Sequence, residues 1–265
     1  MNIIPLAGGV YADGGFTNNM VNHSPKGGSQ LVWSEYNRLV PDPLGRNYLA
    51  LRSFLTQRDY LNNTGVVYSK KAENQEKATL PRWGEVFTYH FRDICPLNWS
   101  IYSPLTGVVT KQLHDVNGGG DARVPTFSVQ MDNYVERFCK AHDESNPVQT
   151  EVYRYTRNPG QEVDVTVQAL WCDGVIVPIN KGFFRIFVGD VLVYELAGKN
   201  SYATPTDANP SYLCNGVYKP VPTDSTWVGK SVEWFQIAAF RVAGIRTPYD
   251  CRQYVDYRLA ANPIF

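Results

Sequence analysis

An alternation of apolar and polar residues that begins at position 163 constrains the fold of this chain more than any other feature. Asp164, Thr166 and Gln168 lie between apolar residues that occupy every second position: Val163, Val165, Val167, Ala169 and Trp171. Successive side chains of a β-strand point to opposite faces, so a period of two is typical of a strand with one buried face. The chain therefore needs a sheet that packs on a core.

Turn signals follow this strand. Asp173-Gly174 is typical of a type I′ hairpin turn and predicts a return strand over 175–179, with Trp171 opposite Ile176. A second hairpin is predicted to run from Phe183 to Val188, turn at Gly189-Asp190 and return from Val191 to Leu196. Glycine in the first turn position favours a type II′ turn.

Period-two or strongly apolar patterns predict further strands over residues 85–91, 100–110, 231–245 and 253–259. The polar stretch 69–82 and the proline-rich stretch 198–226 are predicted to be long loops. A helical excursion is expected near 42–61, where Asp42 can cap a helix that begins at Pro43. Leu44, Tyr48, Leu51 and Leu55 recur there at helical spacing.

These elements predict a mainly β protein, an antiparallel β-sandwich or jelly-roll-like domain with long loops and one or two short helices. The absence of alternating βα units in the pattern argues against a doubly wound enzyme fold.

The first 32 residues differ from the rest of the chain. They contain three glycine pairs and few apolar side chains, so they are expected to form an extended arm that orders only against a partner. Residues 33–265 are expected to form one domain. Apolar residues at both chain ends are the candidate interface residues: Ile3, Ile4, Leu6, Tyr11, Phe16, Ile264 and Phe265.

Composition excludes several classes of partner. Lys plus Arg and Asp plus Glu both number 25, so the chain lacks the basic excess of a nucleic-acid binder, and weak or no nucleic-acid binding is expected. No apolar run reaches the roughly 18 residues that cross a bilayer, and no membrane partner is expected. The start of the chain lacks the pattern of a signal peptide. Five cysteines, an odd number, favour reduced thiols in a protein made in a cytosol.

No cofactor or metal is expected. The segment 115–121 is rich in Asp, Asn and Gly, but it lacks the glutamate that completes a calcium loop. Cys139 and His142 are spaced like zinc ligands, but no second pair follows them. No phosphate-binding glycine motif and no nucleophile motif is present.

A glycosidase needs only two carboxylates across a sugar, and six acidic residues lie on or beside predicted strands: Glu85, Asp93, Glu151, Asp164, Glu195 and Glu233. Glu233 beside Trp234 is the best candidate for an acid with a raised pKa. Carboxylates on a solvated sheet face beside core tryptophans explain the same pattern. No enzyme activity, and in particular no hydrolase activity, is therefore expected.

The sequence favours a structural subunit of a virus or bacteriophage particle, in the capsid or head rather than the tail, that acts by self-assembly. Its expected partners are copies of itself and other virion proteins, and its expected location is the virion after synthesis in the host cytoplasm. The alternative is a glycan- or receptor-binding β-sandwich, because the 17 tyrosines and 6 tryptophans also suit stacking on sugars.

Overall fold

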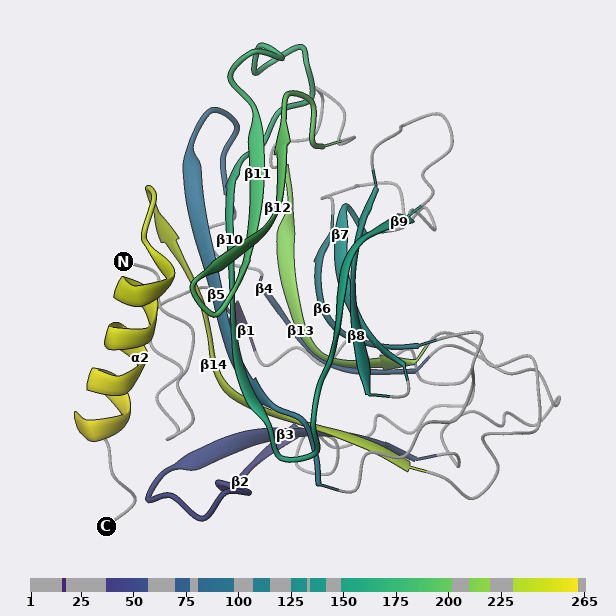
Figure 1. The fold of residues 1–265 in the computed structure, drawn as a ribbon, viewed down its shortest axis with the longest axis vertical. Coiled ribbons are helices and arrows are strands. Elements are labelled where there is room, and N and C mark those ends of the chain that lie inside the picture. Colours follow the sequence, from purple (N-terminus) through teal and green to yellow (C-terminus); the bar gives the residue numbers. More distant parts are fainter. Residues whose placement is uncertain are drawn as a thin grey trace, which may run out of the picture.

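The computed structural model of the chain is a two-layer β-sandwich (Figure 1). It describes residues 16–17, 37–56, 70–76, 81–97, 107–114, 125–132, 134–141, 149–201, 210–219 and 231–261. Two seven-stranded sheets face each other, and every pairing that joins their strands is antiparallel. The predicted fold class is confirmed.

Sheet 1 has the order β1-β4-β13-β6-β7-β8-β9. Its strands are β1 (Phe16–Thr17), β4 (Lys70–Glu76), β13 (Tyr212–Lys219), β6 (Val108–His114), β7 (Phe127–Asp132), β8 (Val135–Ala141) and β9 (Gln149–Thr156). Sheet 2 has the order β12-β11-β10-β5-β14-β3-β2. Its strands are β12 (Val191–Ala197), β11 (Phe183–Val188), β10 (Glu162–Leu170), β5 (Val86–Ile94), β14 (Ser231–Ala243), β3 (Leu49–Thr56) and β2 (Asn37–Pro41).

The core lies between the sheets. Val165, Val167 and Ala169 on β10 are fully buried in this core, as predicted. The prediction of a half-buried strand is wrong, because Thr166 and Gln168 on the opposite face are 0% and 4% exposed. Aromatic residues fill much of the remaining space, and the Trp171 indole N–H donates to the Tyr89 hydroxyl at 3.1 Å. Buried tryptophan and tyrosine need such a partner, because an unpaired polar atom in the core is costly.

The single helix described, α2 (Pro248–Ala261), covers the outer face of sheet 2 (Figure 1). Cys251, Val255 and Leu259 recur every fourth residue and are buried. Thr247 caps the helix, because its hydroxyl accepts from the Asp250 N–H at 3.1 Å. The prediction of a strand over 253–259 is therefore wrong. The alternation seen there also fits a helix with a narrow buried stripe.

Charged residues join α2 to the sheet beneath it. Arg92 on β5 donates to Asp164 on β10 at 2.9 Å and to Asp256 on α2 at 2.5 Å. His90 contacts the same Asp164 carboxylate through Nε2 at 2.9 Å and is completely buried. Burial lowers the pKa of His90, although Asp164 opposes that shift. Arg92 thus ties the helix to the sheet through Asp256, whose side chain is 55% exposed, while His90 and Arg92 themselves are buried.

The predicted helix near 42–61 is wrong. Residues 49–56 form strand β3, which pairs with β2 and β14. Asp42 does cap backbone, since its carboxylate accepts the Arg46 N–H at 3.0 Å, but the cap closes a turn before β3. Pairing on both sides of the strand outweighs the local helical spacing.

The prediction of a hairpin at Asp173-Gly174 is also wrong, although Gly174 has the positive φ, 86°, that such a turn requires. Leu170 pairs with Phe183, so residues 171–182 form one long loop, and Trp171 is buried while Ile176 is exposed. The next hairpin is confirmed: β11 and β12 meet at Gly189, where φ is 59°. The stretches predicted as long loops contain strands β4 and β13.

Candidate functional site

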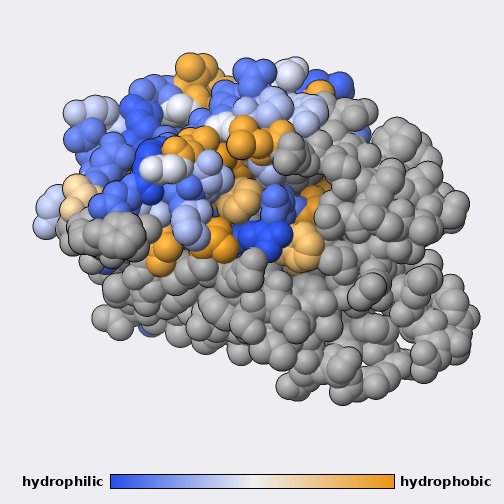
Figure 2. All heavy atoms as spheres, turned by 90° about the horizontal axis from the view of Figure 1, so that it is seen from below, coloured by the Kyte–Doolittle hydropathy of each residue, from blue (hydrophilic) through white to orange (hydrophobic). Residues whose placement is uncertain are grey.

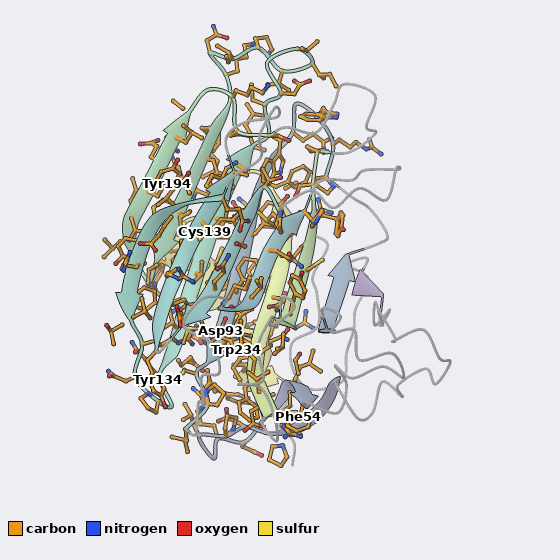
Figure 3. All side chains as sticks on the ribbon, turned by 90° about the vertical axis from the view of Figure 1, so that its right-hand side faces the viewer. Phe54, Asp93, Tyr134, Cys139, Tyr194 and Trp234 are labelled. Atoms are coloured by element: carbon orange, nitrogen blue, oxygen red, sulfur yellow. The ribbon has the colours of Figure 1, made fainter. Side chains whose placement is uncertain are left out.

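The outer face of sheet 1 carries polar side chains over several adjacent strands. Lys111, Phe127 and Phe138 point into the sandwich and are fully buried. The alternate positions on the same strands therefore face outward. On β6, β7 and β8 these outward positions are Gln112, His114, Ser128, Gln130, Arg137 and Cys139. In Figure 3 this sheet faces the viewer, with Cys139 near its middle.

A histidine and a tyrosine meet on this face. β13 pairs with β6 so that Tyr212 lies opposite His114 and Cys214 lies opposite Gln112. The Tyr212 and His114 rings are stacked, with centroids 5.5 Å apart and an interplanar angle of 21°. Each ring is partly exposed. Gln112 comes two residues before His114 and shares its face, but it is only 1% exposed and lies beneath the surface that the two rings reach.

A chain of amide hydrogen bonds extends this polar surface toward β9. Gln130 Nε2 donates to the Ser128 hydroxyl at 3.2 Å and to Gln149 Oε1 at 3.1 Å. Gln149 Nε2 donates in turn to the Pro125 carbonyl at 2.8 Å. Residues in such a network are held in fixed rotamers, which favours recognition of a polar ligand over general solvation.

Arg137 adds a cation beside this network. Its Nη2 lies 3.5 Å from Gln130 Oε1 and 3.6 Å from Asp132 Oδ2, both long contacts. Its buried Nε has no hydrogen-bond partner among the described residues. Gly107 leaves room for the guanidinium, since a Cβ at that position would lie 3.3 Å from Nη2. The Arg137 side chain is 28% exposed, so its guanidinium can still donate to an anionic group.

Proton transfer is the chemistry that this face offers. Histidine and tyrosine are common general bases and acids, and an amide or a guanidinium can stabilise a carboxylate or developing negative charge. Nucleophilic attack by Cys139 is disfavoured, because burial raises the pKa of that thiol to about 11. No cluster of three or more metal-ligating side chains occurs within the described ranges.

The largest group of buried charges lies inside the sandwich. Asp93 on β5 pairs with Lys111 on β6 and with Arg157, whose Nη1 is 2.5 Å from Asp93 Oδ1. Glu136 on β8 contacts both cations, at 3.4 Å from Lys111 and 3.0 Å from Arg157. Burial opposes ionisation of Glu136, but Arg157 and Lys111 outweigh it and lower its pKa. Two acids and two bases thus neutralise each other beside Trp234, where Figure 3 labels Asp93 and Trp234.

The carboxylates considered for a glycosidase do not form a pair across a sugar site. Asp93 and Asp164 belong to the buried networks above. The others lie apart: Glu151 pairs with Arg154, Glu195 with Arg185 and Glu233 with Arg52, and Glu85 is exposed in the turn before β5. The acid pair suggested by Glu233 beside Trp234 is therefore not assembled.

The candidate interface residues fall almost entirely outside the described residues. Phe16 is described in its backbone, which pairs with Glu76 as part of β1. Ile3, Ile4, Leu6, Tyr11, Ile264 and Phe265 lie outside the described ranges, as do the segment 115–121 and His142.

Sequence analysis did not single out His114 and Tyr212 as a pair. The two residues lie on strands far apart in the chain. Tyr212 belongs to the stretch 198–226, predicted to be a loop, and His114 directly precedes the segment 115–121. The sequence evidence that could have indicated this site was weak. It consisted of polar residues at alternate positions of β6 and of tyrosines in the stretch 198–226.

Comparison with solved structures identifies proteins with this architecture. One is an endo-β-1,4-glucuronan lyase from the fungus Trichoderma reesei, with a TM-score of 0.57 and 18% identity over 78% of this chain and 87% of that chain. Another is an alginate lyase of polysaccharide lyase family 7, with a TM-score of 0.54 and 9% identity over 78% of this chain and 84% of that chain. What they share with this chain is the fold. No protein-family model matches the sequence, and no curated protein is similar to it in sequence.

A further alginate lyase of family 7 has a TM-score of 0.51 and 11% identity over 80% of this chain and 84% of that chain. These comparisons contradict the prediction of a virion structural subunit, because the similar structures are polysaccharide lyases. They also contradict the expectation that the protein is not an enzyme. The alternative prediction, recognition of a glycan, agrees better with them.

Proposed function

We propose that this protein is a polysaccharide lyase that binds an acidic polysaccharide on the outer face of sheet 1. The observation that carries the proposal is the stacked, partly exposed pair of His114 and Tyr212 on the outer face of sheet 1, with Gln112 in the next outward position, in a sandwich similar to that of polysaccharide lyases. Arg137 on the same face supports an acidic rather than a neutral substrate, because a guanidinium binds carboxylates well.

The proposed reaction is a β-elimination in a chain of uronic acid units. His114 accepts the proton from the carbon next to the carboxylate. The electron pair left behind forms a carbon–carbon double bond, and the bond to the leaving glycosidic oxygen breaks. Tyr212 donates its hydroxyl proton to that oxygen, so that charge and atoms balance. Gln112 donates to the substrate carboxylate, which lowers the cost of the negative charge that develops there.

Solved structures of the similar lyases support these residue types. A family 7 alginate lyase was solved with product after a tyrosine was replaced by phenylalanine. It was solved with substrate after that change was combined with replacement of a histidine by asparagine. In this chain, His114 and Tyr212 are residues of those two types in ring contact on the outer face.

A substrate panel tests the proposal. The purified chain is incubated with alginate, with glucuronan and with each polymer after its carboxylates have been reduced to alcohols, and unsaturated products are followed by ultraviolet absorbance. We expect product from at least one acidic polymer and none from the reduced forms, because reduction removes the group that acidifies the reacting proton.

Binding is measured on the same polymers by calorimetry. Binding of an acidic polymer with no product would contradict the lyase and support the glycan-binding alternative. Neither binding nor product from any polymer would contradict both readings.

A further inference from the structure

The loop between β10 and β11 carries a cluster of exposed aliphatic side chains. The exposed fractions are 73% for Val175, 42% for Ile176 and 58% for Ile179. We call residues 174–181 the apolar tip. In Figure 1 the loop stands at the upper end of the molecule, beyond the strands that it joins. At the opposite end, seen in Figure 2, apolar residues are interspersed with polar ones.

Hydrogen bonds hold the apolar tip in a fixed shape. The Asp173 carboxylate Oδ1 accepts the backbone N–H groups of Val175, Ile176 and Val177 at 3.0, 2.9 and 3.2 Å. The Lys181 N–H donates to the Pro178 carbonyl at 2.9 Å. Val177 alone among the aliphatic side chains of the tip is buried. The others are held away from the body of the protein and cannot collapse onto it.

The base of the loop is also anchored. Asn200 Nδ2 donates to the Leu170 and Phe183 carbonyls, both at 2.9 Å, and its Oδ1 accepts the Cys172 N–H at 3.0 Å. These contacts tie both ends of the loop to the segment that follows β12. Little ordering entropy therefore remains to be lost when the tip contacts another surface.

The chemistry of the tip fits a lipid surface better than a protein partner. Protein interfaces draw most of their binding energy from Trp, Tyr and Arg, and they are depleted in Lys. The tip instead combines aliphatic side chains with the exposed Lys181, and the Lys199 side chain approaches Gly174. Asp173, the acid of this loop, is buried and directed at backbone N–H groups. Aliphatic residues flanked by lysines suit the interfacial region of an anionic bilayer.

We propose that the apolar tip docks on a lipid bilayer that contains anionic headgroups. Val175, Ile176 and Ile179 enter the interfacial layer, and Lys181 and Lys199 contact the headgroups. The contact is peripheral, and no helix within the described ranges has the length and apolar character needed to cross a membrane. It does not depend on the carbohydrate function, because the tip extends from sheet 2 whereas the proposed lyase site lies on sheet 1.

Vesicle flotation of the full chain tests this inference. The vesicles are phosphatidylcholine with or without phosphatidylserine. We expect flotation with phosphatidylserine, and a loss of binding of about tenfold or more when Val175, Ile176 and Ile179 are all replaced by Ser. The matched control replaces Val191 and Leu192 by Ser, since these residues are 65% and 44% exposed at the β11–β12 turn. That control should bind as the unchanged chain does.

A Lys181→Glu variant separates charge from apolar contact, and it should weaken binding to phosphatidylserine vesicles while changing no core contact. Failure of the unchanged chain to float with either vesicle would overturn the proposal. Equal losses in the tip variant and the turn control would also overturn it. Because lyase activity is measured without lipid, failure here leaves the proposed carbohydrate function standing.

Discussion

At the scale of single residues, burial decides which charged groups are structural. Lys140 on β8 points into the sandwich, where its Nζ donates to the Ala141 carbonyl at 2.9 Å and to the Asn200 carbonyl at 2.5 Å. It lies 5.1 Å from the centre of the Phe184 ring and has no ion-pair partner among the described residues. Burial lowers the pKa of Lys140 from 10.5 to about 7.

This shift makes the stability of the protein depend on pH. Between a pKa of about 7 in the folded state and about 10.5 in the unfolded state, the unfolded chain binds more protons. The free energy of unfolding should therefore rise with pH across that window, by at most about 1.4 kcal/mol per pH unit from this residue. A Lys140→Met variant should lack this contribution.

Chemical unfolding of both proteins between about pH 7 and pH 10 measures the difference. The advantage of the unchanged chain over Lys140→Met should grow with pH, and a difference that stays constant would contradict the assignment. Lys181→Met is the control, because Lys181 is exposed and should give no such trend.

At the scale of the elements, the sequence predicted strands better than their connections. The alternation over β10 and β5 correctly predicted strands, and the glycine turn between β11 and β12 correctly predicted a hairpin. Both strands are nevertheless buried on two faces, which alternation does not predict. The predictions failed where pairing partners far along the chain decide the outcome. Strand β3 lies between β2 and β14, and α2 depends on the sheet beneath it. The predicted turn at Asp173-Gly174 failed because the Asp173 carboxylate caps a loop instead.

The same long-range dependence hid the candidate site. Each of its residues is ordinary in its local context, and the pair of His114 and Tyr212 exists only because β6 and β13 are neighbours in sheet 1. The arm-based interface stays a prediction, since its side chains lie outside the described residues.

Close packing around Gly182 fixes the long loop between β10 and β11. A Cβ there would lie 2.2 Å from the Gly198 carbonyl oxygen and 2.3 Å from the Cys172 Cβ, and neither atom can move freely. We expect Gly182→Ala to lower the free energy of unfolding by about 3 kcal/mol. Gly189→Ala is the control: its Cβ would meet no atom within 4 Å, so about 1 kcal/mol of backbone strain at a φ of 59° is expected. Equal losses in urea unfolding would contradict this account of the loop.

At the scale of the whole molecule, the outer faces of the two sheets differ in what covers them. The outer face of sheet 2 is covered by α2 (Figure 1), and the Arg92 network joins the two. The outer face of sheet 1 carries an amide network, a cation and a histidine–tyrosine pair. On the outer face of sheet 1, Gln112, Ser128 and Cys139 are buried, whereas His114, Gln130, Arg137 and Tyr212 are partly exposed. These partly exposed side chains can form a binding surface on a rigid support. This asymmetry is the basis of the proposed lyase.

The most direct test of that account is the rate at which unsaturated product forms from an acidic polysaccharide that the unchanged chain cleaves. We expect His114→Asn and Tyr212→Phe each to lower kcat by about a hundredfold or more, because each removes a proton-transfer group. Tyr257→Phe on the exposed side of α2 is the matched control and should keep the full rate, since Tyr257 is 70% exposed and far from sheet 1 in the fold. A His114→Asn variant that retains the full rate would contradict the proposed site.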